Sequence, residues 1–384
     1  MAGLYIHIPL CASRCIYCNF YSTTSLKLRQ RYVDAVCREM ELRSLAPTPP
    51  KEEGSIETIY LGGGTPSQLT IPQLHQLFNA IYKYNKVEMD AEVTIEMNPD
   101  DITEVFADGL CMLPVNRVSM GAQTFDDERL KWLHRRHASR QVIEAMERLR
   151  DNGIQNISID LMYGFPGETL EDWQRDIDAA LSLDVEHISA YCLMVEEGTP
   201  LWKWIRNNGQ WTMDEELERQ MYEVLIDKLT AAGYEHYEIS NFAKPGYRSK
   251  HNSSYWQDIP YIGLGAAAHS YTVLGGSSSE TTSFRSWNVA DIHQYIEANE
   301  RGELPSEQEE IDDDTHYNDR ITVALRTSDG LDLTTLSDRH RRYCLKEAQR
   351  FLDDGLLQLC DNRLSLTRKG LFVSDYIMSS LIMV

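Results

Sequence analysis

Short apolar runs and longer amphipathic stretches alternate along the first half of the chain. The short runs predict strands at Leu4–Ile8, Thr58–Leu61, Glu92–Met97, Arg117–Gly121, Ser158–Met162 and His187–Leu193. The amphipathic stretches predict helices at Leu26–Leu45, Ile71–Tyr84, Ser139–Asp151 and Leu170–Leu183. Connections of this length suit right-handed crossovers, so the strands should pair in parallel. The pattern therefore predicts an α/β fold whose six βα units form an open or partial (β/α)6 barrel.

The C-terminal part of the chain has a different pattern of predicted helices and strands. Helical patterns and a short turn predict, in order, helices at Asp314–Thr327 and Tyr343–Asp353, a strand at Arg363–Thr367 and a final helix at Arg368–Ser379. Helices followed by a small hairpin indicate a smaller, winged-helix-like module. We therefore expect a core domain at 1–240, a connecting segment at 241–300 and this module at 301–384. The acidic run at 309–314 is interpreted as a solvated linker.

Composition narrows the class of protein. The 384 residues carry a formal net charge of −22, which argues against nucleic-acid binding, including by the winged-helix-like module. Eight cysteines at irregular spacing, without an export signal, fit a reducing compartment, so we expect a cytoplasmic protein. No apolar run approaches the roughly 18 residues that a membrane span needs. The apolar tail at 381–384 allows peripheral membrane contact at most, and we expect it to pack on the module or fray.

Cys11, Cys15 and Cys18 form a C-x3-C-x2-C run near the N-terminus. Three thiolates can hold three corners of a [4Fe–4S] cluster. No fourth cysteine follows, so one iron would stay open for a small ligand, as in catalytic metal sites. The alternatives are an incomplete zinc site or a chance group of buried thiols.

Polar and glycine residues recur where the predicted strands end. Gly62–Pro66 follows the second strand, Glu96 ends the third, Gln123 follows the fourth, and Asp160 lies within the fifth. Ligands gather at this edge in parallel α/β folds. Each residue also has a structural interpretation, as a tight turn, a helix cap or a surface charge. A purely structural interpretation is harder to give for Asp160, because an acidic side chain between apolar neighbours must be paired or functional.

These motifs resemble those of the radical S-adenosylmethionine (SAM) superfamily. Tyr5–Pro9 leads into the cysteines, and the motifs at 62–66, 96–99, 121–125 and 159–164 narrow the resemblance to the coproporphyrinogen III oxidase-like branch. The resemblance implies that SAM binds the open iron and that an electron donor reduces the cluster. It assigns Glu96 to the amino group, Arg135 to the carboxylate and Asp160 to the ribose. The residues it places around SAM are Tyr5, Tyr17, Gly63, Gly64, Thr65, Glu96, Gln123, Arg135 and Asp160.

Within that branch two functions compete. One is the oxygen-independent oxidase, which decarboxylates two propionates of coproporphyrinogen III. The other is the haem chaperone (HemW) group, which binds haem and transfers it to acceptor haemoproteins. The oxidases have a longer N-terminal arm and a further cysteine where this chain has Phe20. Residues 251–256 also match the H-N-x-x-Y-W signature of the chaperones. We therefore expect a chaperone, with SAM cleavage left open and the oxidase as the alternative.

His251 is the candidate haem ligand in this signature. Imidazole is a common axial ligand of haem iron, and Tyr255 and Trp256 could stack on a porphyrin. A lone histidine is more often a satisfied structural residue, and the two aromatic side chains could belong to the core. His7 and His269 are weaker candidates, which we interpret as structural.

Overall fold

The structure is a computed structural model that describes residues 2–45, 55–208, 214–275 and 281–383. Six parallel strands form the centre of a mixed twelve-stranded sheet. They are β1 (Ala2–Ile8), β2 (Ile56–Gly63), β3 (Val87–Met97), β4 (Arg117–Gln123), β5 (Asn156–Tyr163) and β6 (His187–Cys192). Neighbours along the chain pair side by side from β1 to β6. The predicted α/β fold with parallel βα units is confirmed.

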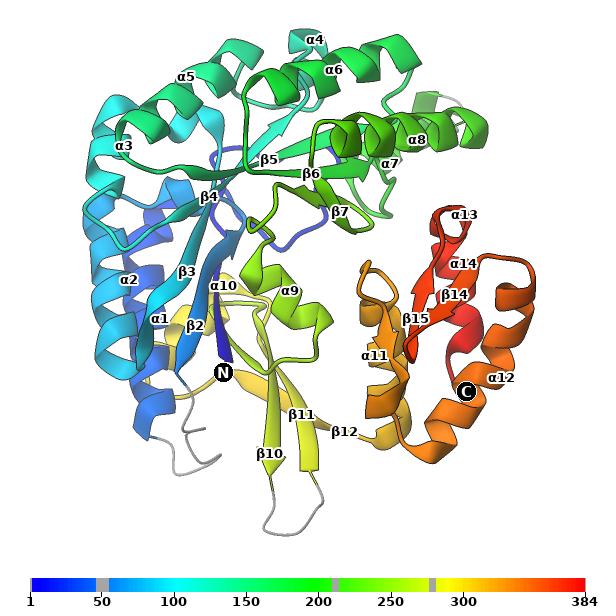
Figure 1. Cartoon of the computed structure of the whole chain (residues 1–384). Helices are drawn as coiled ribbons and strands as arrows, with labels where there is room; N and C mark the ends of the chain where they lie inside the picture. The colour runs from blue at the N-terminus through cyan, green and yellow to red at the C-terminus, as the bar shows by residue number, and fades with distance from the viewer. Residues whose placement is uncertain (1, 46–54, 209–213, 276–280, 384) are drawn as a thin grey trace.

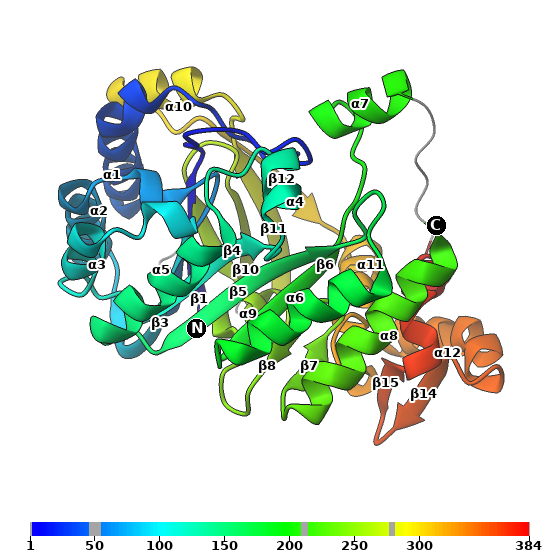
Figure 2. The same cartoon turned by 90° about the horizontal axis from the view of Figure 1, so that it is seen from above.

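Helices cover the outside of these strands, as both general views show (Figures 1 and 2). Each turns one apolar stripe inward; in α5 the stripe is Val142, Ala145, Met146 and Leu149, spaced three to four residues apart. The outer helices are α1 (Arg29–Leu45), α2 (Ile71–Tyr84), α3 (Glu104–Leu110), α5 (Ser139–Asp151), α6 (Leu170–Ser182) and α8 (Glu215–Ala231). Shorter helices α4 (Asp127–Trp132) and α7 (Pro200–Asn208) complete this half.

The two faces of the parallel strands differ sharply in polarity. Residues such as Ile59, Ile95 and Val118 face the helices and belong to the main apolar core. The alternate positions carry polar side chains on the inner face: Thr58, Tyr60, Thr94, Glu96, Arg117, Ser119, Ser158, Asp160, His187 and Ser189. Closed barrels usually fill this space with branched apolar residues. An inner face this polar indicates that the barrel interior serves a ligand or a hydrogen-bond network.

Strands from residues 235–311 extend the same sheet on both sides. β8 (Asn241–Ala243) pairs with β6 and with β7 (Glu235–Glu238), while β9 (Tyr261–Leu264) runs parallel to β1. Beyond β9 lie β10 (His269–Gly275), β11 (Thr281–Asn288) and β12 (Ser306–Ile311), with α9 (Lys250–Trp256) and α10 (Ile292–Glu300) between strands of this series. The segment at 241–300 thus contributes strands to the main sheet, and its predicted boundaries stay a prediction.

The acidic run is not a linker, so that expectation is wrong. Residues up to Ile311 form β12, which pairs antiparallel with β11 at the sheet edge. Asp312 caps the next helix by accepting a hydrogen bond from the backbone N–H of Thr315 at 2.7 Å. Charged side chains suit an edge strand because they oppose pairing with another chain. Only β12's last residue, Ile311, is buried.

The C-terminal module has its own apolar core. It contains α11 (Asp313–Ala324), β13 (Leu331–Asp332), α12 (Asp338–Asp353), β14 (Leu357–Cys360), β15 (Arg363–Leu366), α13 (Arg368–Leu371) and α14 (Ser374–Leu381). The single final helix that we expected is two helices, and Phe372 between them packs against Tyr222 of α8. The tail packs on the module, where Tyr317 and Asn318 donate hydrogen bonds to the carbonyls of Leu381 and Met383.

Within the described residues, no helix has the length and apolar character to cross a membrane.

Candidate functional site

The loop after β1 carries the three cysteines beside the ends of the neighbouring strands. Thr65 Oγ1 lies 3.5 Å from Cys11 Sγ, and Arg135 Nη1 lies 3.5 Å from Cys15 Sγ. The backbone N–H of Cys18 donates to the carbonyl of Cys15 at 3.3 Å. All three thiols are free. The fold therefore brings the cysteine run together with two of the residues that the sequence assigned to the same site.

A small apolar cluster fixes this loop. Ile16, between the cysteines, is buried against Leu133, Phe165 and Leu201. Its backbone N–H donates to the carbonyl of Leu133, and its carbonyl accepts from Leu201 N–H at 2.9 Å. The cysteine loop is thus held from both sides by segments that follow β4 and β6.

The glycine loop after β2 is a close-packed turn. Gly63 has φ +109°, and a Cβ there would lie 2.4 Å from the ring of His7. A Cβ on Gly64 would lie 2.9 Å from backbone atoms of the β1 segment. Only glycine fits such close approach and left-handed backbone. The turn sets Thr65 beside Cys11 and leaves Gly63 N–H directed at Glu96, 3.0 Å from Oε2.

Glu96 is held at the end of β3 by two donors. Tyr60 OH donates to Oε1 at 2.8 Å, and Gly63 N–H donates to Oε2. Burial raises the pKa of this carboxyl above its usual value, although both hydrogen bonds act in the opposite direction. A carboxylate held in this way can accept a further hydrogen bond from an ammonium group, which would also offset its burial.

Arg135 links the cysteine loop to the ends of β3 and β4. Its Nη2 donates to Asn98 Oδ1 and to the carbonyl of Gly121, both at 2.7 Å. Its Nε is buried without a hydrogen-bond partner. Buried polar atoms are rarely left unpaired, so an orphaned N–H beside a cysteine indicates room for an acceptor such as a carboxylate. Asn98 belongs to a motif that the sequence singled out, but its role as the partner of Arg135 appears only in the structure.

Gln123 and Asp160 complete the site at the carboxyl ends of the parallel strands. We call this site the rim; it comprises the cysteine loop and the polar and glycine residues where β2 to β5 end. Gln123 ends β4 with φ +70°, a conformation that few residues other than glycine adopt. Asp160 Oδ1 accepts a long hydrogen bond, 3.4 Å, from Ser119, and the side chain of Ser189 also bonds this carboxylate. Burial, and then the charge of Glu96, raise the pKa of Asp160 to about 7. This carboxylate has free acceptor capacity inside the barrel, as a site for hydroxyl groups requires.

Tyr5 lies on β1, and Tyr17 lies in the cysteine loop. Tyr5 OH hydrogen-bonds His7 Nδ1 at 2.9 Å, while His7 Nε2 donates to the carbonyl of Tyr21. His7 is therefore tied within the protein, in line with its structural interpretation. Tyr17 packs beside the apolar cluster of the cysteine loop. His269 is exposed on β10 and stays outside the rim.

Arg117 is an interior residue that sequence reasoning missed as a candidate. Its side chain is 1% exposed, no described residue accepts a hydrogen bond from its guanidinium, and its Nε is fully buried. Its charge lowers the pKa of Asp160, against the larger effect of burial. Arg117 begins the strand we expected at Arg117–Gly121, and its alternation with Ser119 and Gly121 was the available signal that it faces inward.

His251 lies on α9, away from the cysteine loop. It is 1% exposed, with Nδ1 2.8 Å from Thr58 Oγ1 and Nε2 2.8 Å from Tyr255 OH. The ring also stacks on Tyr60 at 5.1 Å. Burial, with a smaller effect from the charge of Arg117, lowers the pKa of His251 to about 3. Both ring nitrogens are engaged, so iron coordination by His251 stays a prediction that would require release of one partner.

The donor set at the rim suits an iron–sulfur cluster better than a single ion. Among the residues that the structure describes, no group of three His, Cys, Asp or Glu side chains is arranged around one metal position. A [4Fe–4S] cluster is a different case, because each cysteine sulfur binds its own iron. Three free thiols on one short loop, next to an arginine with an unpaired N–H, fit a cluster and an anionic ligand.

Known proteins share both the fold and the motifs. Residues 5–180 match the family model described as Radical SAM superfamily, and residues 311–373 match the HemN C-terminal domain. The structure of coproporphyrinogen III oxidase (HemN) from Escherichia coli has a TM-score of 0.82 and 21% identity, covering 99% of this chain and 89% of that one. Fold and site thus define a radical SAM protein, and this superfamily implies a [4Fe–4S] cluster and SAM as cofactors.

Curated relatives narrow the class to one family. The protein named heme chaperone HemW from Bacillus subtilis is 35% identical, with 96% of each chain covered. The protein of the same name from Mycobacterium tuberculosis is 32% identical over 99% of this chain and 94% of its own. The one from Escherichia coli is 35% identical over 70% and 69%. The chain belongs to the HemW family, which confirms the resemblance seen in the sequence.

Proposed function

We propose that this protein is a haem chaperone that binds haem and passes it to acceptor haemoproteins. The observation that carries the proposal is its similarity over nearly the whole chain to relatives named heme chaperone HemW. The H-N-x-x-Y-W signature at 251–256 also supports it. The similarity to the oxidase is at the level of fold alone, since identity is 21%.

At the strand ends we propose a cluster and SAM site. Cys11, Cys15 and Cys18 hold a [4Fe–4S] cluster, which supplies an electron to SAM when a donor has reduced it. Glu96 accepts from the amino group of SAM, and the unpaired Nε of Arg135 faces its carboxylate. Asp160 accepts from the ribose hydroxyls. Close backbone approach and side-chain packing come from Tyr5, Tyr17, Gly63, Gly64, Thr65 and Gln123.

A paired assay on anaerobically reconstituted protein tests the function. In one arm haem is titrated into the protein, and the loaded protein is then mixed with a haem-free b-type haemoprotein. We expect a Soret band at a stoichiometry near one and its shift to the acceptor's spectrum. In the other arm coproporphyrinogen III is supplied with SAM and a reductant, and we expect no protoporphyrinogen. Robust conversion in that arm, or an absence of haem binding with an intact cluster, would overturn the proposal.

A further inference from the structure

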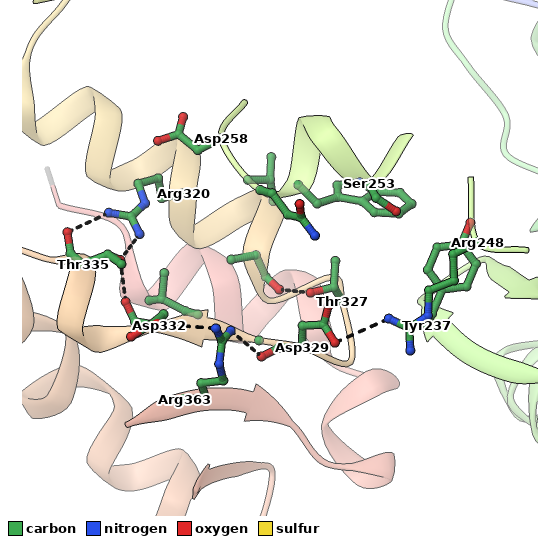
Figure 3. A pocket seen from close by; sticks show the side chains of 16 residues that line it. Tyr237, Arg248, Ser253, Asp258, Arg320, Thr327, Asp329, Asp332, Thr335 and Arg363 are labelled. Carbon is green, nitrogen blue, oxygen red and sulfur yellow. Dashed lines mark hydrogen bonds and ion pairs between the residues drawn. The ribbon is translucent and has the colours of Figure 1, made fainter. Parts of the chain in front are cut away.

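The C-terminal module meets the barrel around a cavity of about 490 Å³ (Figure 3). Trp256 of α9 lines this cavity on the barrel side, and Thr327 lines it on the module side. Beside Thr327, the backbone N–H of Ser328 donates to the carbonyl of Tyr237 at 3.0 Å, so the segment after α11 pairs with the edge strand β7. The module is therefore joined to the main sheet at the residues next to Arg326.

Glu238 of β7 is a buried carboxylate that the module provides with a cation. Arg326 donates to its Oε1 through Nε at 2.9 Å, and Arg326 Nη2 lies 2.8 Å from the same oxygen. The second oxygen, Oε2, accepts from the backbone N–H of Ser240 at 2.9 Å and from Nδ2 of Asn241 at 2.6 Å. An ionised carboxylate has no proton to donate. Glu238 therefore acts only as an acceptor towards Asn241.

This contact fixes the orientation of the Asn241 amide. With Nδ2 directed at Glu238, the other amide atom, Oδ1, faces Ser189 of β6, the register partner of Asn241 on β8. Ser189 Oγ donates to this oxygen at 2.8 Å. A reversed amide would set two acceptor oxygens against each other at Glu238. The direction of the bond from Ser189 to Asn241 therefore follows from the charge of Glu238.

Ser189 has a second possible acceptor, because its side chain also bonds Asp160, the carboxyl group that we assign to the ribose of SAM. A serine hydroxyl has one proton, so Ser189 can donate to Asn241 or to Asp160 but not to both. Asn241 Oδ1 can only accept, and its bond therefore uses this proton. A lone pair of Ser189 then faces Asp160, which keeps its capacity to accept hydrogen bonds from a ligand.

We propose that Asn241 and Ser189 are positioning residues of the SAM site: Asn241 takes the Ser189 proton and thereby leaves Asp160 free for the ribose hydroxyls. The inference rests on the SAM site proposed above and adds two residues that act on it through Asp160. Glu238 and Arg326 hold Asn241 in the required orientation, so the C-terminal module contributes to the site through this chain of side chains.

The direction of this chain has a consequence for the ionisation of Asp160. A proton donated by Ser189 would stabilise the carboxylate and lower the pKa of Asp160 below about 7. Because the ribose hydroxyls would bind the ionised form, the rise of SAM affinity with pH would then occur at a lower pH. The other titratable and charged groups that face Asp160 come from four strands and are Tyr60, Glu96, Arg117 and Tyr191. All four stay unchanged in the variants proposed below.

Equilibrium binding of SAM to reconstituted protein, measured across the rise in affinity with pH, tests the inference. The ionisable groups of SAM are common to all variants, and Asp160→Asn shows which part of the rise comes from Asp160. In Ser189→Ala we expect the midpoint of that part to stay near its wild-type value. In Asn241→Leu, Ser189 keeps Asp160 as its acceptor, so the midpoint should fall by about one pH unit. Ser306→Ala, an exposed serine on β12, is the matched control.

The double variant Ser189→Ala/Asn241→Leu should return the midpoint to its wild-type value, because the shift requires the Ser189 hydroxyl. A midpoint that rises by about one pH unit in Ser189→Ala would overturn the inference, since Ser189 would then donate to Asp160 in wild type. An unchanged midpoint in Asn241→Leu would overturn it as well.

These two results leave the proposed SAM site in place, whereas a wild-type protein that binds no SAM removes both the site and the inference. Wild type that binds SAM without a rise due to Asp160 removes the inference alone. Cluster iron content and far-ultraviolet circular dichroism verify that each variant is folded, and Ser189→Ala alone decides the direction of the bond where Asn241→Leu does not fold.

Discussion

The rim of the barrel and the α9 region use buried polar groups in opposite ways. At the rim, Arg135 leaves Nε unpaired, and burial, followed by the charge of Glu96, raises the pKa of Asp160 to about 7. Around α9, His251 uses both ring nitrogens, and Glu92 accepts the backbone N–H groups of Lys250 and His251 at 3.1 and 3.0 Å. Buried polar groups are normally satisfied, so the unpaired N–H of Arg135 beside the cysteine loop leaves room for a ligand there. Burial and residue type alone therefore do not distinguish a ligand site from a structural hydrogen-bond network.

The largest effect should follow from removing the rim's thiols. Replacing Cys11, Cys15 and Cys18 together by Ala should reduce the iron content of reconstituted protein from about four per chain to nearly none, since no other cysteines stand in a comparable run. Iron and sulfide analysis measures this. A Cys111→Ala and Cys360→Ala variant, which changes two exposed cysteines, is the control. Full iron retention in the triple variant would remove the cluster assignment.

His251→Ala should have the largest effect on stability. The change leaves Thr58 Oγ1 and Tyr255 OH without partners and opens a cavity beside Tyr60, so we expect a loss of about 3 kcal/mol in the free energy of unfolding. Denaturant unfolding with the cluster in place measures it. His293→Ala, on the exposed side of α10, should change little. A fully stable His251→Ala protein would contradict the structural network.

The same histidine has a pH signature. Its pKa is about 3 in the folded protein and near 6.5 in the unfolded chain, so its stabilising contribution is present above pH 6.5 and is lost as the pH falls towards 3. Within that window it adds about 1.4 kcal/mol per pH unit to the slope of stability against pH. In the His251→Gln variant, the slope of the free energy of unfolding against pH should be smaller by that amount between pH 3 and 6.5.

Glu96→Gln tests the rim with a smaller change. The amide keeps the shape of the side chain but removes the charge, so SAM should bind about 1.5–3 kcal/mol more weakly, the range for a hydrogen bond to a charged group. Equilibrium binding to reconstituted protein gives the dissociation constant. Glu104→Gln, at the exposed start of α3, is the matched control. An unchanged constant in Glu96→Gln would remove this residue from the SAM site.

The smallest expected effect is a pH dependence at the rim. With a pKa of about 7, Asp160 is largely protonated at pH 6, and a ribose hydroxyl would bind its ionised form. The affinity for SAM should therefore rise about tenfold from pH 6 to pH 8 and level off above that. Asp160→Asn should bind more weakly and lose this rise. A wild-type affinity that does not respond to pH would exclude Asp160 as an acceptor that titrates on binding.

The order of the elements and most of the rim residues could be predicted from the amino-acid sequence alone. Strand and helix periods are local properties, so β2 and α5 could be located from a few neighbouring residues. The rim residues follow from parallel strands, whose carboxyl ends must meet at one edge. Local patterns predict the wrong structure for the acidic run: they indicate a linker, whereas residues up to Ile311 form β12, because β11 provides an edge with which they pair.

Which buried polar groups have hydrogen-bond partners depends on contacts between residues that are far apart in the sequence. His251 meets Thr58 across 193 residues of sequence, and no local signal shows that this contact engages its ring. The same holds for Arg117, which begins a predicted strand but is buried inside the barrel, where its Nε has no hydrogen-bond partner among the described residues. The cavity between α9 and the C-terminal module is lined by residues far apart in the sequence, so only the tertiary fold brings them together. Hydrogen-bond satisfaction depends on distant partners, and for that reason the sequence could name His251 and Trp256 as candidates but could not assign them to opposite sides of one helix.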